Sequence, residues 1–151
     1  MKKFKFTLQP LLSYKETVER LQKAELKRAQ QALQELLDEE QRLLSAYADN
    51  ERSLEKALKR NVNVGSALTE HDAFFRFLRD ALIEVRVLIT EAEEVVRKCQ
   101  ERLIVTMKEI KTYNKLRNEQ FQSWRKEVQA EEDKEMGDLV SFNVITEEIN
   151  V

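Results

Sequence analysis

The sequence predicts an all-α protein: two long helices that form an antiparallel coiled-coil hairpin, with the second helix longer. The chain of 151 residues contains only 2 Gly and 1 Pro, so it has few residues that favour chain reversals. It is 42% hydrophobic and 36% charged, which is too apolar for a disordered tail and typical of long helices. An apolar seven-residue repeat in the second half completes the prediction.

The first helix is expected over about residues 7–60. Thr7 suits the N-cap, and Pro10 is tolerated in a first turn, where its missing N–H has no partner to lose. Apolar residues then follow at spacings of mostly three and four, which is the helical period. The step from Val18 to Ala29 is eleven residues and predicts a stutter that relaxes the supercoil. The apolar positions are Leu8, Leu11, Val18, Leu21, Ala29, Leu33, Leu36, Leu43, Tyr47, Leu54 and Ala57.

The chain reversal is expected at about residues 61–67, within "KRNVNVGSALTEHD". Two Asn and the first Gly favour a turn there, and Ser66 and Thr69 could cap the next helix. Glu70 and Asp72 suit its first turn, where free backbone N–H groups favour negative charge. No other convincing reversal occurs in the chain.

The second helix is expected over about residues 68–136. Its a and d positions form an unbroken heptad repeat, which requires a helical partner, and the single reversal makes that partner the first helix. Glu40 in the first helix and Thr106, Arg117 and Gln120 here are polar seam positions that can specify register. The a and d positions are Phe75, Leu78, Leu82, Val85, Ile89, Ala92, Val96, Cys99, Leu103, Thr106, Ile110, Tyr113, Arg117, Gln120 and Trp124.

A reversal at this place sets Leu11 beside about residue 117, so the end of the second helix should project unpaired or nearly so. This arm carries Phe121, Trp124 and Val128 at i, i+3 and i+7, on one face. Residues 1–136 are therefore predicted to form the hairpin, and residues 137–151 a C-terminal tail. The tail, "LVSFNVITEEINV" after Gly137 and Asp138, could be an extended segment, a docking motif or a fraying end.

The sequence lacks the residues that several classes of function require. There is no glycine-rich phosphate loop and no nucleophile with a histidine base, so we expect no enzyme and no cofactor. His71 has no second histidine or paired cysteine to bind a metal, and both it and Cys99 are interpreted as seam residues. The net charge is −2, and the basic residues are interleaved with acidic ones, so the chain lacks the basic stripe that nucleic-acid binding needs. No apolar run is long enough to span a membrane, the N-terminus lacks a signal sequence, and the lone cysteine suits a reducing, cytosolic compartment.

The segment "EHDAFFRFLRDALIEV", residues 70–85, carries three phenylalanines in four positions. Phe75 belongs to the seam, Phe74 lies at its edge, and Phe77 points mainly away from the first helix. Two explanations are open for the spare rings. Loop residues Val62 and Val64 could fold over Phe77, or an exposed apolar patch could bind a protein. We favour the second, with Phe74, Phe77, Leu78 and Ala81 as the patch.

The opening "FKFTLQPLLSYKE" resembles the start of the FliJ family, coiled-coil proteins of the flagellar type III export apparatus. The pattern F-x-x-x-L-x-x-A at Phe74, Leu78 and Ala81 and the acidic "EEDKEMGD" extend the resemblance over about residues 4–138. It implies a two-helix stalk similar to the coiled coil of the rotary-ATPase γ subunit. The tail from Leu139 is not recognised as a family feature.

The resemblance also implies partners. FliJ proteins bind the hexameric export ATPase (FliI-like), promote its assembly, and contact the cytosolic domain of the export-gate protein (FlhA-like). They also have a role in recycling export chaperones. The family's gate-binding stripe maps onto Phe74, Leu78 and Ala81, and the end with both termini, with Phe121, Trp124 and Val128, would face the ATPase. The protein would be cytoplasmic and associated with the inner membrane only through the export apparatus.

Two alternatives stay open at this point. The equivalent stalk of a virulence-type secretion system, the YscO-like proteins, shares this architecture. A generic structural coiled coil would act as a spacer or dimeriser and would have no effect on an ATPase.

Overall fold

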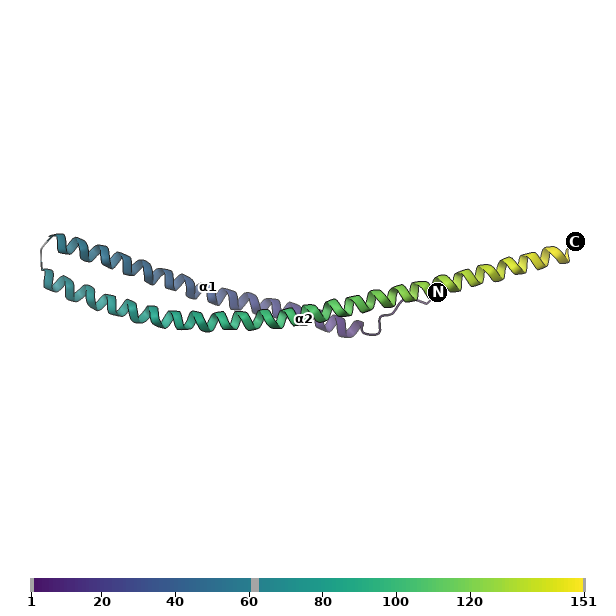
Figure 1. Ribbon diagram of the computed structural model, residues 1–151, viewed down its shortest axis with the longest axis horizontal. Helices are drawn as coiled ribbons and strands as arrows, with labels where there is room; N and C mark the ends of the chain where they lie inside the picture. The colour runs from purple at the N-terminus through teal and green to yellow at the C-terminus, as the bar shows by residue number, and fades with distance from the viewer. Residues whose placement is uncertain (1, 61–62, 151) are drawn as a thin grey trace. The chain divides into compact units, whose positions relative to one another are not determined.

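The computed structural model describes residues 2–60 and 63–150, and within them the chain forms two helices. Helix α1 spans Gln9–Arg60 with 52 residues, and α2 spans Val64–Ile149 with 86 residues. The helices run in opposite directions and pack against each other (Figure 1). The predicted all-α fold, with a longer second helix, is therefore confirmed.

Helix α2 begins four residues earlier than predicted. Asn63, with φ of 51°, has the left-handed conformation that asparagine adopts more readily than most residues, and its carbonyl accepts a hydrogen bond from Ala67 N at 3.0 Å. Thr69 does not cap the helix, because its hydroxyl donates to the Gly65 carbonyl at 2.9 Å from within it. Residues 64–67, also predicted for the turn, belong to α2. Asn61 and Val62 lie outside the described part of the chain.

The chain divides into two compact units, each containing parts of both helices. The hairpin unit comprises Arg20–Ile104, and the terminal unit comprises Met1–Glu19 with Val105–Val151. Both are described below by their own contacts.

In the hairpin unit, α2 follows the predicted heptad repeat. Every predicted a and d position from Phe75 to Leu103 is buried or half-buried, so the repeat is confirmed. Contacts across the seam fix the register. Tyr47 packs on Phe75 with ring centroids 4.7 Å apart, and the Asn50 side-chain amide donates to the His71 carbonyl at 3.1 Å. Glu40, a predicted polar seam position, pairs with Arg86 at 3.5 Å.

The seam of helix α1 differs from the predicted one near Leu21. Leu21 is 61% exposed and does not belong to it, whereas Gln22 and Leu26 are half-buried. From Gln22 onward the seam alternates spacings of four and three. From Val18, which is also half-buried, it runs at spacings of four, four and three to Ala29, which is the eleven-residue step from which the stutter was predicted. Within the hairpin unit, the seam residues of α1 that are buried or half-buried are Gln22, Leu26, Ala29, Leu33, Leu36, Glu40, Leu43, Tyr47, Asn50, Leu54 and Ala57.

The terminal unit has its own core around Leu12, which is fully buried, whereas the predicted Leu11 is 40% exposed. Leu12 clusters with Phe6 and Ile110, so residues before the start of α1 contribute to this core. Four half-buried side chains pack against the cluster: Phe4, Leu8, Tyr113 and Leu116.

The heptad prediction fails where this core ends. Arg117, predicted at a seam position, is exposed, and Leu116 is half-buried in its place. The side chains that cover α2 here come from the N-terminal segment, which is not helical at Phe4 and Phe6. A partner that is not a helix does not require a 3.5-residue repeat.

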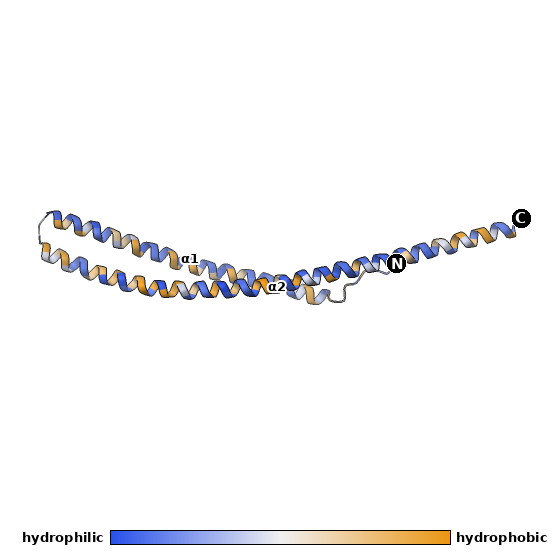
Figure 2. Cartoon of the chain, viewed as in Figure 1, coloured by the Kyte–Doolittle hydropathy of each residue, from blue (hydrophilic) through white to orange (hydrophobic). Residues whose placement is uncertain are grey.

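Helix α2 does not end near residue 136. It continues through Gly137 to Ile149, so residues predicted as a separate tail are helical up to that point. All described residues from Gln129 onward are exposed. Hydrophobic residues nevertheless recur in this last part of α2, where Figure 2 shows them in orange. They are Met136, Leu139, Val140, Phe142, Val144, Ile145 and Ile149.

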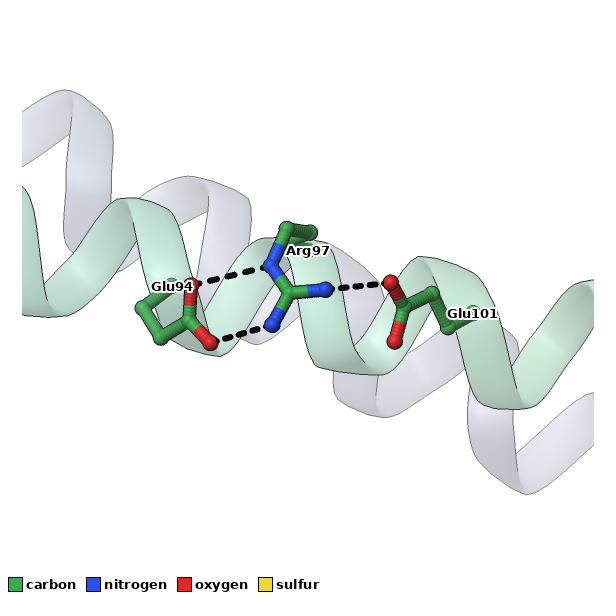
Figure 3. Close-up of polar contacts among 3 residues, drawn as sticks. All are labelled: Glu94, Arg97 and Glu101. Carbon is green, nitrogen blue, oxygen red and sulfur yellow. Dashed lines mark hydrogen bonds and ion pairs between the residues drawn. The ribbon is translucent and has the colours of Figure 1, made fainter.

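The outer surface of α2 carries ion pairs within the helix, as at Arg97. Its Nε donates to Glu94 at 2.9 Å, and its terminal nitrogens contact Glu94 and Glu101 (Figure 3). The hydrogen bond from Arg97 lowers the pKa of Glu94, and the two carboxylates raise the pKa of Arg97. Such pairs three and four residues apart support a solvated helix face and do not form a binding site.

Candidate functional site

Phe74 and Phe77 form an exposed aromatic pair early in α2. The rings stack with centroids 6.3 Å apart, and the residues are 42% and 63% exposed. Phe74 lies at the edge of the seam, and the same heptad position continues with Ala81, Leu88 and Val95. Leu88 and Val95 are also exposed, so the apolar edge is longer than the predicted patch.

The loop does not cover Phe77 in the part of the chain that the structure describes. Val64 is the first residue of α2, and thirteen residues of helix, about 20 Å at 1.5 Å per residue, separate it from Phe77. The explanation in which Val64 folds back over this ring is therefore wrong. Val62, the other residue of that explanation, lies outside the described residues.

The other two residues predicted for this patch differ in exposure. Leu78 is only 2% exposed and belongs to the seam between the helices. Ala81 is half-buried at its edge. In this conformation a partner can reach Phe74 and Phe77 directly and Ala81 partly, while Leu78 packs beneath them.

The second predicted patch, in the terminal unit, is partly covered by the chain itself. Phe4 packs against Phe121 with ring centroids 5.3 Å apart and against Trp124 at 5.8 Å, and Phe121 and Trp124 stack at 5.7 Å. Trp124 and Val128 are half-buried and Phe121 is 37% exposed. The expectation that this aromatic face is unpaired is wrong up to Trp124.

Sequence reasoning missed the N-terminal side of this cluster. The signal was the phenylalanine pair in "KFKF", which has the alternation of an extended segment with one apolar face. Phe6 is buried and Phe4 half-buried, while Lys3 and Lys5 are exposed, as that alternation predicts.

Two surface hollows flank this cluster in the terminal unit. One, of about 490 Å³, is lined by residues of the N-terminal segment and of α2, with Lys2, Lys3 and Lys5 on one side and Glu119 and Glu127 on the other. The second, of about 280 Å³, lies further along α2 and is lined by Lys2, Trp124, Glu127, Val128, Glu131, Glu132 and Glu135. Both hollows therefore combine aromatic surface with charge.

Both surfaces expose grouped aromatic side chains. Aromatic side chains that lie exposed in groups are the usual anchors of protein interfaces. Over residues 2–60 and 63–150, no group of three or more His, Cys, Asp or Glu could hold a metal ion. In the same residues, neither helix has a stretch apolar enough to cross a membrane.

A two-helix hairpin with exposed aromatic residues early in α2 and an aromatic cluster at its N-terminal segment defines a class of all-helical coiled-coil proteins. Comparison with known protein families identifies the family to which the chain belongs. Residues 4–148 match the model of the flagellar FliJ protein, and the chain belongs to the FliJ family. It is therefore a non-catalytic component of flagellar protein export.

The family match also covers most of the segment that the sequence reasoning set apart. It extends to residue 148, so the helix after Leu139 is part of the family's domain and not an added tail. The family is flagellar, which decides between the flagellar and virulence-type alternatives. No curated protein and no solved structure matches the chain.

Proposed function

We propose that this protein is a coiled-coil stalk that binds and stimulates the hexameric export ATPase and contacts the export gate. Membership of the FliJ family carries the proposal, because the resemblance to that family implies both contacts. The two aromatic patches supply a separate surface for each partner.

The gate would bind the patch early in α2. Phe74 and Phe77 present two stacked rings to solvent. Ala81, which is half-buried, follows Phe77 by one helical turn. Leu78 supports this surface from the seam, since it is buried there. A partner that covers the rings removes their apolar surface from water, at about 25 cal/mol per Å².

The ATPase would bind the arm around Trp124. Phe121, Trp124 and Val128 share one face of α2, and Phe4 extends this face with a third aromatic ring. Beyond Gln129 the helix is exposed on all sides, so it can enter a ring of subunits without first separating from α1. A role in recycling export chaperones is part of the proposal, with no residues assigned to it.

The experiment is ATP hydrolysis by the matching export ATPase, with and without this protein at near-equimolar amounts. Stimulation is expected, and Trp124→Ala should reduce it. Tyr14→Ala is the control, because Tyr14 is also an exposed aromatic residue of the terminal unit but lies outside the cluster. No stimulation by the wild type would sink the ATPase proposal and leave the generic structural coiled coil. Equal stimulation by the two variants would remove the arm from the contact.

A further inference from the structure

One face of α2 combines an aromatic ring with a row of carboxylates. Glu127, Glu131 and Glu135 follow Trp124 at spacings of three and four, so all four side chains lie on the same side of the helix. Together with Val128, Glu132 and Lys2 they line the hollow of about 280 Å³. We call this surface the acidic face.

The chain's own N-terminal segment occupies one end of the acidic face. Phe4 packs on the Trp124 ring, and Lys2 reaches the hollow and lines it with the four glutamates. The segment "KKFKF" alternates lysine with phenylalanine after its first residue. It therefore shows which chemistry fits here: an apolar ring on Trp124 with a cation beside the carboxylates.

Most of the negative charge of the acidic face is not neutralised by the N-terminal segment. A single lysine lines this hollow with four glutamates. Residues 127–148 contain eight acidic residues and one lysine, a net charge of −7, whereas the whole chain has −2. Every described residue from Gln129 onward is exposed, so no other part of the described chain covers this segment.

Charge and apolar surface together indicate the occupant. Repulsion among carboxylates along a bare helix is unfavourable, and a cationic partner would relieve it. A lysine or arginine placed in the hollow would also lie beside Trp124, which lines it, and aromatic rings attract cations. The exposed apolar residues after Met136 would extend the contact along the same helix.

We infer that the acidic face docks a basic segment of the export ATPase, with a lysine or arginine side chain in the hollow beside Trp124. The inference rests on the proposed function for the identity of the partner. Complementary charge of this kind speeds association and fixes the register of the docked segment.

The test compares two double variants with the same change in charge. Glu131→Lys with Glu135→Lys reverses two carboxylates of the acidic face. Asp133→Lys with Glu147→Lys reverses two exposed carboxylates on the opposite side of α2, since Asp133 lies about 200° around the helix from Glu131. Neither pair contributes to the packed core, so both variants should keep the wild-type helix content.

Binding to the ATPase should weaken about tenfold or more in the acidic-face variant and stay within about twofold in the control. Raising the salt from 50 to 500 mM should weaken wild-type binding, because exposed charges are screened. If the two variants bind equally while the wild type still stimulates the ATPase, the inference is overturned and the proposed function stands.

A second probe makes no use of the ATPase. Trp124 is the only tryptophan, so its fluorescence reports directly on the acidic face. A capped KKFKF peptide should change that fluorescence in a saturable way with the full-length wild type and bind at least about tenfold more weakly to the acidic-face variant. Peptide binding without ATPase binding would refute the proposed function and keep the acidic face as a site for basic segments. A peptide that binds neither form, or both equally, would overturn the inference.

Discussion

Lys15 and Glu109 join α1 to α2 in the terminal unit, with Nζ and Oε2 2.5 Å apart. The hydrogen bond to Glu109 is the main cause that raises the pKa of Lys15 above its usual 10.5. A raised pKa means that the pair stabilises the folded state fully below pH 10.5, and that this contribution is lost as the pH rises through the raised value.

We therefore expect Lys15→Met to lower the Tm at pH 7 and to have a smaller effect above the raised pKa. Methionine keeps the apolar stem of the side chain, so the comparison isolates the charge. Thermal unfolding followed by circular dichroism would measure it, with Lys27→Met, an exposed lysine of α1, as the control. A loss of Tm that stays the same at every pH would show that packing, not the ion pair, is responsible.

The exposed pair Phe74 and Phe77 leads to a prediction about binding to the export gate. Replacing both with alanine should weaken binding to the export gate about tenfold or more, since exposed aromatic anchors dominate such interfaces. Helix content should not change, because both rings are solvent-exposed. Ile83→Ala with Val87→Ala removes two exposed apolar side chains elsewhere on α2 and should bind normally. Pull-down and motility assays would compare the variants, and equal binding by both would remove the gate from this patch.

The two leucines of α1 that the sequence ranked wrongly provide a test at the scale of the element. Leu12 is fully buried and Leu21 is 61% exposed. Leu12→Ala should cost about 2–5 kcal/mol of unfolding free energy through lost burial and a cavity, whereas Leu21→Ala should stay within about 0.5 kcal/mol. Urea denaturation of both variants would measure the difference. Equal losses would mean that Leu21 belongs to the seam after all.

The difference between the helices explains what the sequence could predict. In α2 nearly every seam position up to Tyr113 is apolar, so the heptad repeat stands out from the outer face. In α1 the seam includes Gln22, while the apolar Leu21 lies next to it and is exposed. An amphipathic pattern counts apolar residues only, so it placed Leu21 in the seam and left Gln22 out.

The register of the terminal unit depended on the length of the reversal. A reversal centred at residue 64 sets Leu11 beside 117, but α1 ends at Arg60 and α2 begins at Val64, which centres it near 62. Lys15 accordingly pairs with Glu109, and Phe4 reaches Phe121 and Trp124. Turn residues give helix ends only to within a few residues, so this cover of the arm could not be predicted. The apolar patch at Phe74 and Phe77 could be predicted from the sequence, because it depends on the heptad pattern of α2 alone.

Across the whole molecule, buried contacts are distributed unevenly along α2. Buried residues recur from Leu78 to Ile110, whereas every described residue from Gln129 to Asn150 is exposed. A helix held only by its own hydrogen bonds opens far more easily than one packed against a partner. The end of α2 should therefore be the part of the helix that a binding partner stabilises most.

Deleting residues 137–151 should accordingly leave the Tm of the protein nearly unchanged. The far-ultraviolet circular dichroism signal should fall by about a tenth, because Gly137–Ile149 is that share of the two helices. Deleting residues 2–6 is the matched control: it removes Phe4 and Phe6, which pack in the terminal unit, and should lower the Tm although it removes less helix.

If the C-terminal deletion lowers the Tm as much as the N-terminal one, the end of α2 must contact the rest of the chain or a second copy in solution. An ultracentrifugation measurement of mass would distinguish these two cases. If it leaves the Tm unchanged but reduces ATPase stimulation, the exposed helix acts through its partner, as the proposed docking requires.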